Sequence, residues 1–401
     1  MVDDFSLASL PYGSVRRTPG ARARLCVALG AYAVELGPLA ERLGVPRELV
    51  DAPNLDRLLA AEHAVWADLR ASLQALLSAG PPPPELMFPL AQAVPCLPFT
   101  VGDYVDFFSS LEHATNLGRL LRPGSEPLLT NWRHLPVGYH GRASTVVVSG
   151  TPVHRPLGQR PGPNGPTWGL SEALDIEAEL GVVVGGPPNA LGEPIAIDRA
   201  TERIFGVVIV NDWSARDIQS WEYQPLGPFL GKSFATSISS WVVPLAALER
   251  HRVPAPVQDP EPFEYLRAAG RWGLDINLEL MLRPAGKAPQ TIARVNARGL
   301  YWTATQQLVH MASNGAIVRP GDLYASGTIS GAEPGAQGSL IELTRGGAQP
   351  LALGGVERRF LVDRDVVTIA AWAGSAPRAS RLYVGEVSGE IVPTSPRDRP
   401  R

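Results

Sequence analysis

The pattern of apolar and polar positions predicts a chain built mostly from short strands. Apolar runs of strand length recur from residue 145 onward, and 40 Gly and 39 Pro, which follow no repeating period, separate them. Seven segments have this character: 145–153, 175–184, 204–210, 241–245, 276–282, 339–343 and 366–371. We therefore expect a mostly β fold.

Helical spacing of apolar residues occurs in few places. The clearest helix is predicted over residues 54–79, where leucines lie on one stripe, Asn54 is placed to cap the start and Gly80 follows the end. We place a domain boundary near residue 98, so that a small β-rich domain with this long helix spans 1–98 and a larger domain spans 99–401. Shorter helices are predicted over 103–121, 213–223 and 303–314.

Composition excludes several classes of protein. The chain has 401 residues, with 36 Lys and Arg against 39 Asp and Glu, and this net charge of −3 does not suit a nucleic-acid binder. No apolar stretch approaches the roughly 18 residues of a membrane helix. The first four residues are acidic and unlike a secretory signal, and the two cysteines lack metal-ligand spacing, so we expect a cytoplasmic protein.

An acid pair precedes the most apolar part of one predicted strand. If 175–184 is a strand, Glu177 and Glu179 project from the same face, about 7 Å apart. Their repulsion would be relieved either at a water-exposed edge or by a bound cation. The pair alone favours the exposed edge over a metal site.

A second candidate follows the apolar strand 204–210. Asp212 ends it, and on the next predicted helix Arg216, Gln219 and Tyr223 share one face. These side chains form either a polar wall around a ligand or a solvated helix face that Asp212 caps. On its own, this segment favours the solvated face.

Two further candidates are a carboxylate with a histidine and a rare lysine. On the predicted helix 103–121, Asp106 and His113 are two turns, or about 10.5 Å, apart on one face. That separation allows a ligand and a base at opposite ends of a pocket. Lys232 is one of only two lysines, and glycines and aromatic residues flank it, so it needs an anionic partner or a catalytic role.

Together, several of these segments resemble the fumarylacetoacetate hydrolase family. The resemblance is colinear over nearly the whole chain and weakest in the first 80 and last 30 residues. The runs that carry it, besides the acid pair, are 102–107, 113–116, 135–144, 211–219, 225–234 and 325–331.

The resemblance implies a fold and an activity. The fold would be a small SH3-like N-terminal barrel followed by a β-roll catalytic domain with a few short helices. The activity would be that of a homodimeric, metal-dependent hydrolase of a small diketo acid. It would split a carbon–carbon bond of 4-fumarylacetoacetate into fumarate and acetoacetate, the last step of tyrosine breakdown.

The resemblance also assigns roles to individual residues. It implies a Ca²⁺ and/or Mg²⁺ site, in keeping with the preference of these hard ions for oxygen ligands, at Asp106, Glu177, Glu179 and Asp212. A second magnesium locus would involve Lys232 and Thr236. His113 would be the general base, Glu342 the acid that orients it, and Lys232, Gln219 and Arg216 the groups that stabilise the alkoxide.

Expected substrate contacts are Arg122, Tyr139, Gln219, Tyr223 and Thr328. Phe108 departs from the family pattern, because a tyrosine that contacts substrate is expected at this position. The loss of a phenol donor favours a weaker hold on the substrate carboxylate or a somewhat different diketo acid.

Two alternatives stay open at this point. One is a related acylpyruvate or other diketo-acid hydrolase or decarboxylase of the same family. The other is a catalytically inactive binding protein on the same fold, for which Phe108 is the only observation.

Overall fold

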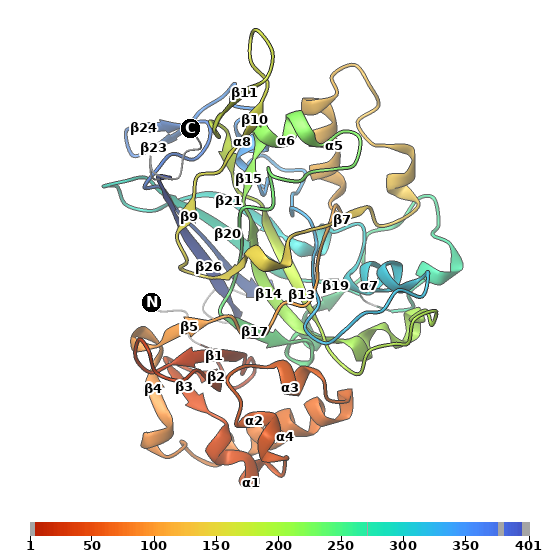
Figure 1. Ribbon diagram of the computed structural model, residues 1–401. Coiled ribbons are helices and arrows are strands. Elements are labelled where there is room, and N and C mark those ends of the chain that lie inside the picture. Colours follow the sequence, from red (N-terminus) through yellow and green to blue (C-terminus); the bar gives the residue numbers. More distant parts are fainter. Residues whose placement is uncertain (1–4, 271, 376–380, 395–401) are drawn as a thin grey trace.

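The computed structural model describes residues 5–270, 272–375 and 381–394. The acidic start of the chain, residues 1–4, lies outside them, as do the outer ends of both expected domains. Short strands dominate the described structure, which confirms the mostly β prediction (Figure 1). None of the helices in these ranges is long and apolar enough to cross a membrane.

The N-terminal strands form one end of the largest sheet. Neighbouring strands run in the order β4-β3-β2-β1-β17, so the N-terminal strands continue into the rest of the molecule through the β1–β17 pair. Their bounds are β1 (Tyr12–Arg16), β2 (Arg24–Leu29), β3 (Tyr32–Glu35), β4 (Met87–Pro89) and β5 (Val94–Cys96). Four helices lie at the lower end of the molecule in Figure 1: α1 (Ala40–Leu43), α2 (Arg47–Val50), α3 (Asp56–Leu59) and α4 (His63–Ala79).

Residues 54–79 form two helices, not the single helix that their spacing predicts. α3 and α4 are separated at Glu62, whose backbone is extended. At the break, the Leu58 carbonyl accepts the indole N–H of Trp66 at 2.8 Å, and both side chains are buried. The N-cap residue of α3 is Leu55 and not Asn54, although the Asn54 side chain accepts the backbone N–H of Asp56 at 3.2 Å.

The rest of the largest sheet is organised around the antiparallel pair β13–β14. It continues in the order β17-β14-β13-β22-β6-β7, and β22 and β6 run parallel. Short strands β16 and β8 extend it beside the end of β14. The bounds are β6 (Tyr104–Phe107), β7 (Gly138–His140), β8 (Val146–Val148), β13 (Ala178–Val184), β14 (Ile204–Asp212), β16 (Thr236–Ile238), β17 (Trp241–Pro244) and β22 (Leu323–Ala325).

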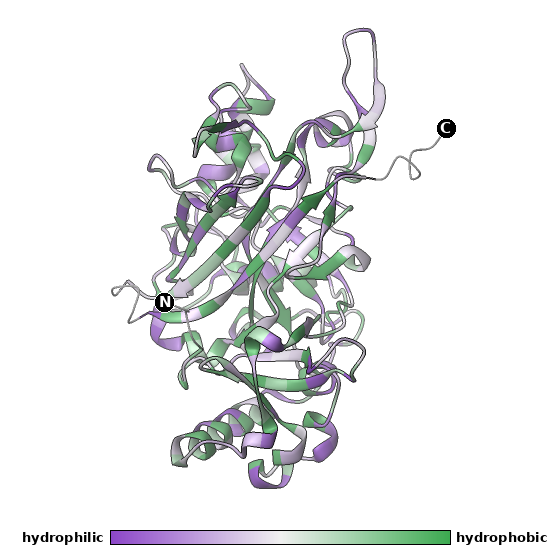
Figure 2. Cartoon of the chain, turned by 90° about the vertical axis from the view of Figure 1, so that its left-hand side faces the viewer, coloured by the Kyte–Doolittle hydropathy of each residue, from purple (hydrophilic) through white to green (hydrophobic). Residues whose placement is uncertain are grey.

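A second sheet of five strands packs on the first. Its order is β21-β20-β25-β26-β9, and its apolar residues share one core with those of β13 and β14. In Figure 2 its long strands are largely green, with purple residues interspersed along them. The bounds are β9 (Val153–His154), β20 (Ile276–Arg283), β21 (Gln290–Asn296), β25 (Val366–Ala373) and β26 (Leu382–Val392).

Smaller elements surround these sheets. Four two-stranded pairs are β10 (Leu157–Arg160) with β11 (Thr167–Leu170), β12 (Leu174–Asp175) with β15 (Ser214–Ala215), β18 (Arg252–Val253) with β19 (Gly273–Leu274), and β23 (Leu351–Leu353) with β24 (Val356–Arg358). The remaining α-helices are α5 (Leu111–Leu121), α6 (Arg216–Glu222), α7 (Ala304–Ala312) and α8 (Leu340–Leu343).

Several segments differ from their predicted type or extent. The predicted helix 103–121 begins with a strand, because β6 pairs with β22 from a distant part of the chain. The predicted strand 339–343 contains the helical turn α8, and the predicted strands 145–153 and 175–184 are each interrupted. α7 agrees with prediction: Thr303 and Gln306 form a capping box at its start.

Candidate active site

Four buried carboxylates come together from the part of the largest sheet in which β14, β13, β22 and β6 are neighbours in that order. Asp106 is on β6, Glu177 directly precedes β13, Glu179 is on β13 and Asp212 ends β14. One oxygen from each lies within 4.8 Å of the others, and all four residues are at most 4% exposed. β22, between β13 and β6, sets their spacing by pairing with both.

The chemistry of this acidic cluster fits a hard divalent cation. Asp106 Oδ1 and Glu179 Oε1 are buried and accept no hydrogen bond from the described residues. Burial, together with the negative charge of Asp212 on Asp106 and of Asp106 on Glu179, raises the pKa of both carboxyl groups well above their usual values. A bound cation would satisfy these oxygens and keep them ionised.

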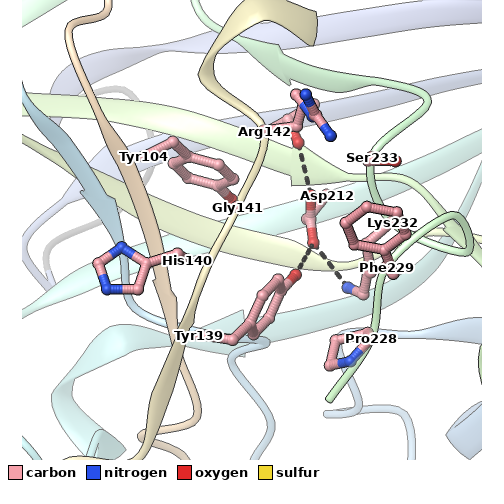
Figure 3. A pocket seen from close by; sticks show the side chains of 11 residues that line it. Tyr104, Tyr139, His140, Gly141, Arg142, Asp212, Pro228, Phe229, Lys232 and Ser233 are labelled. Carbon is pink, nitrogen blue, oxygen red and sulfur yellow. Dashed lines mark hydrogen bonds and ion pairs between the residues drawn. The ribbon is translucent and has the colours of Figure 1, made fainter. Parts of the chain in front are cut away.

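Lys232 lies against the cluster, as the resemblance implies. Its ammonium donates to Asp212 Oδ2 at 2.6 Å and to Glu177 Oε2. Burial alone would lower its pKa, but Asp212 and Glu177 raise it above the usual lysine value. Thr236 donates to Asp212 Oδ1 at 2.6 Å, and Tyr139 to Oδ2 at 3.2 Å, so several donors converge on Asp212 (Figure 3).

Arg216 joins the cluster to a carboxylate that the sequence analysis missed. Its guanidinium lies 2.8 Å from Asp175 and 2.7 Å from Glu177, and it donates to Gln219 at 3.0 Å. Asp175 is fully buried and also accepts the backbone N–H groups that begin α8. The only sequence signal for Asp175 was that it is the first of three acids that alternate with apolar residues at the start of the predicted strand 175–184.

His113 and Glu342 form a buried pair beside this cluster. His113 Nδ1 lies 2.6 Å from Glu342 Oε2, and its Nε2 lies 3.8 Å from Glu177 Oε1. The Glu342 carboxylate also accepts hydrogen bonds from three side chains that the sequence did not point to: Asn116, Ser330 and Ser339. The pair therefore joins the start of α5 to α8.

Three interpretations made from single segments are wrong. Asp106 and His113 do not share a helical face, because Asp106 is on a strand and His113 is in the first turn of α5. Asp212 does not cap α6, whose N-cap residue is Ala215. Glu177 and Glu179 are not at a water-exposed edge, because strands cover β13 on both sides.

The side chains expected to contact substrate differ in whether their polar atoms already have hydrogen-bond partners within the protein. Arg122 Nε and Thr328 Oγ1 are buried and have no hydrogen-bond partner among the described residues, so both are available to a ligand. Gln219 accepts from Arg216, and the partly buried Tyr223 accepts from Gln224. Phe108 is partly buried, with its ring centroid 5.4 Å from that of His113 in an edge-to-face arrangement.

Fold and site together define a mostly β protein with a buried acidic cluster that could hold a metal ion, next to a histidine–glutamate pair. Two family models match the chain: Fumarylacetoacetase N-terminal over residues 8–98 and Fumarylacetoacetate (FAA) hydrolase C-terminal over residues 104–381. The chain therefore belongs to the fumarylacetoacetate hydrolase family.

Proteins named fumarylacetoacetase are similar over nearly their whole length. Those of Rattus norvegicus and Homo sapiens are 45% and 44% identical, each over 97% of this chain and 96% of the relative. That of Arabidopsis thaliana is 42% identical over 98% of this chain and 96% of the relative.

Solved structures share the fold at low sequence identity. A fumarylacetoacetate hydrolase from psychrophilic Exiguobacterium antarcticum has a TM-score of 0.57 at 16% identity, covering 96% of this chain and all of that chain. A maleylpyruvate hydrolase from Sphingobium sp. SYK-6 has a TM-score of 0.53 at 15% identity, with the same coverage.

Proposed function

We propose that the protein is a fumarylacetoacetase, which hydrolyses a carbon–carbon bond of 4-fumarylacetoacetate to fumarate and acetoacetate at the end of tyrosine breakdown. The observation that carries this proposal is the buried His113–Glu342 pair, whose free Nε2 lies 3.8 Å from a carboxylate of the acidic cluster. The identity of 39–45% to proteins of that name supports the same activity.

His113 is proposed as the general base. Because Glu342 accepts from Nδ1, it holds the imidazole in the tautomer whose Nε2 can take a proton. Nε2 removes a proton from water, whose oxygen attacks the carbonyl carbon of the fumaryl group. The carbon–carbon bond then breaks, its electrons pass to the departing acetoacetate carbanion, and a proton is returned to that carbon.

Positive groups beside the acids are proposed to stabilise the negative charge of this step. Lys232 and Arg216 both contact Glu177, and Gln219 is oriented by Arg216. A donor of this kind contributes about 3 to 4 kcal/mol to transition-state stabilisation. Lys232 cannot be exchanged for Arg in this reading, because a planar guanidinium does not fit where a compact ammonium bridges two carboxylates.

The proposed cofactor is Ca²⁺ and/or Mg²⁺. Asp106, Glu177, Glu179 and Asp212 would hold the ion, which when bound polarises a carbonyl of the diketone and stabilises an enolate. Lys232 and Thr236, which both donate to Asp212, would lie at a second magnesium locus.

The wider organisation is also proposed on the resemblance. Residues 1–98 would be an N-terminal domain with an SH3-like barrel and 99–401 the catalytic β-roll domain. The protein would act as a homodimer in the cytoplasm, and the two free cysteines, Cys26 and Cys96, suit a reducing compartment.

A second candidate is hydrolysis of another diketo acid, such as an acylpyruvate. Phe108 favours it, because a phenol donor to the substrate is missing there. Comparing kcat/KM for fumarylacetoacetate and for acylpyruvates separates the two candidates.

The test of the proposed function is loss of the diketone absorbance of fumarylacetoacetate, measured with metal analysis of the same protein. We expect turnover that requires bound Ca²⁺ or Mg²⁺ and that His113→Ala abolishes, whereas His134→Ala, at an exposed histidine outside the site, leaves it unchanged. An inactive wild-type protein that holds its metal would favour the inactive binding protein. Equal turnover by His113→Ala would remove His113 from the mechanism.

A further inference from the structure

A small cavity opens on the side of Asp212 where Tyr139 and Lys232 meet it. Its volume is about 160 Å³, enough for one end of a small organic acid. Neither His113 nor Arg122 lines it, so it is an extension of the acidic site and not the space around the base. Its lining includes Tyr104, Tyr139, Arg142, Asp212, Phe229 and Lys232 (Figure 3).

Arg142 is an uncompensated cation in this lining. It follows β7, it is exposed, and its guanidinium carbon lies 5.9 Å from the ring centroid of Phe229. No carboxylate of the described residues pairs with it, whereas Lys232 and Arg216 are each held by two. Stacking on an aromatic ring limits how the guanidinium can turn and leaves its N–H groups free for a carboxylate.

Tyr104 contributes an unused donor from the opposite direction. It is 1% exposed, and among the described residues its hydroxyl has no hydrogen-bond partner, although Thr236 lies near enough to influence its pKa. Thr236 already donates its own hydrogen to Asp212. A buried hydroxyl without a partner costs free energy unless a ligand or water satisfies it.

The lining of the cavity itself contains one acid, Asp212, and two cations, Lys232 and Arg142. Asp212 is the nearest acid in the lining, and it accepts from Lys232, Thr236 and Tyr139. Within the lining, Lys232 offsets Asp212 and no second acid faces Arg142. The other acids of the cluster, Asp106, Glu177 and Glu179, lie outside the lining, and a bound cation would offset their charge.

We propose that this cavity binds one of the two carboxylates of the substrate, with Arg142 as a specificity-determining residue and the Tyr104 hydroxyl as a second donor. The inference rests on the proposed function, because 4-fumarylacetoacetate carries a carboxylate at each end. Arg122, with its unpartnered Nε outside this cavity, is available for the other carboxylate. Two separate arginines would then select a dicarboxylate over a diketo acid with one charged end.

The experiment measures kcat/KM for three substrates: fumarylacetoacetate, fumarylacetone, which lacks the acetoacetate carboxylate, and 3,5-dioxohexanoate, which lacks the fumaryl carboxylate. For Arg142→Gln we expect a fall of about tenfold or more with fumarylacetoacetate, carried mainly by KM. With one of the two monocarboxylates the variant should equal the wild type, because that substrate never engages Arg142. Tyr104→Phe should show the same selectivity with a smaller effect.

Arg133→Gln is the matched control, because Arg133 also lies over an aromatic ring, 6.0 Å from the centroid of Tyr301, away from this cavity. An equal fall for all three substrates, or no fall with Arg142→Gln, would overturn the proposal. Calorimetric binding of fumarate and of acetoacetate needs no turnover, so it tests the cavity even if the wild type hydrolyses none of the three. There, Arg142→Gln must weaken one of the two acids about tenfold, and unchanged binding of both would refute the assignment.

Discussion

Glu342 shows how one side chain can be tuned by its neighbours. Burial alone would raise the pKa of its carboxyl group, but His113, Asn116 and Ser339 outweigh burial and lower the pKa to about 2, from 4.5. A carboxylate this well bonded stays ionised at any ordinary pH. It can therefore hold the His113 imidazole in one orientation throughout a catalytic cycle.

Replacing this carboxylate should change the pH dependence of stability. Since the pKa of Glu342 is lower in the folded than in the unfolded chain, its contribution is complete above pH 4.5 and is lost as pH falls toward 2. Glu342→Gln should therefore cost about 3 kcal/mol near neutral pH and progressively less below pH 4.5. Urea unfolding at several pH values measures this difference.

The control is Glu333→Gln, at an exposed glutamate whose side chain forms no ion pair with the described residues. It should leave stability unchanged across the same range. A Glu342→Gln difference that is as large at pH 3 as at pH 7 would contradict the argument.

Phe108 is the position at which adding a single hydroxyl group tests whether a hydrogen-bond donor to the substrate is missing. Its ring packs edge-to-face on His113, so a hydroxyl at its end would lie near the base without displacing it. Phe108→Tyr should lower KM for fumarylacetoacetate about tenfold or more, since one charge-assisted hydrogen bond contributes about 1.5 to 3 kcal/mol. Phe263→Tyr, at an exposed phenylalanine, is the control, and an unchanged KM would argue against a missing donor.

At the residue scale, the identities of the candidate site residues could be predicted better than their burial and their hydrogen-bond partners. The proposed metal ligands and the proposed base come from the runs that resemble the family. The burial of Glu177 and Glu179 could not be inferred from their spacing, because it depends on β14 and β22 covering β13 on both sides. Asp175 was missed because its partners on α8 are 165 and 166 residues away.

At the element scale, local pattern failed where distant contacts decide the conformation. Residues 339–343 alternate like a strand, yet the N–H groups of Leu340 and Ile341 donate to the buried Asp175 and begin a helical turn. Residues 104–107 have helical spacing, yet they pair with β22. In α7 the capping residues Thr303 and Gln306 are only three residues apart, and there the predicted helix is confirmed.

Glu222, at the end of α6, positions the segment that carries Lys232. Its Oε1 accepts the backbone N–H groups of Phe229 at 2.8 Å and Gly231 at 2.7 Å. Gly231 lies so close to α6 that a Cβ would be 2.8 Å from the Gln219 nitrogen. The carboxylate thus holds the residue before Lys232 against the helix that carries Gln219.

Removing this acceptor should loosen Lys232 without unfolding the protein. Glu222→Ala is expected to lower kcat about tenfold and to cost about 1 to 3 kcal/mol of stability. Glu222→Gln keeps an acceptor oxygen and should recover most of kcat. Steady-state kinetics of both variants measure this, and equal kcat values for Ala and Gln would show that the acceptor is unimportant.

At the scale of the whole molecule, the acidic cluster links metal binding to stability. The cluster packs four acids against two cations, so removal of a bound ion leaves unscreened repulsion at the junction of β6, β13 and β14. We expect chelation to lower Tm and Ca²⁺ or Mg²⁺ to restore it, with about 2.7 kcal/mol gained at a hundredfold excess over Kd.

Asp106→Asn separates this effect from general salt effects. One acid fewer should make the metal-free variant more stable than the metal-free wild type, while its response to Ca²⁺ and Mg²⁺ should be lost. Thermal unfolding with and without each ion tests both parts. A variant that is less stable than the wild type without metal would contradict the repulsion argument.

The mostly β fold could be predicted from the apolar runs and the dispersed Gly and Pro, but the continuity of its largest sheet could not. β1 pairs with β17, so residues on both sides of the expected boundary near 98 share one sheet. That pairing joins segments more than 200 residues apart, and single-sequence patterns carry no information on such partners.

The same long connections determine when the site can exist during synthesis. His113 and Glu342 are 229 residues apart, so at about 5 to 20 residues per second the ribosome needs on the order of ten to fifty seconds to add the second after the first. Glu177, Glu179 and Asp212 are added in the course of this interval, so all four acids are made before the α8 turn that Asp175 anchors. Because His113 and Glu342 are proposed to act together, we expect a nascent chain, or a chain that ends before residue 342, to be inactive.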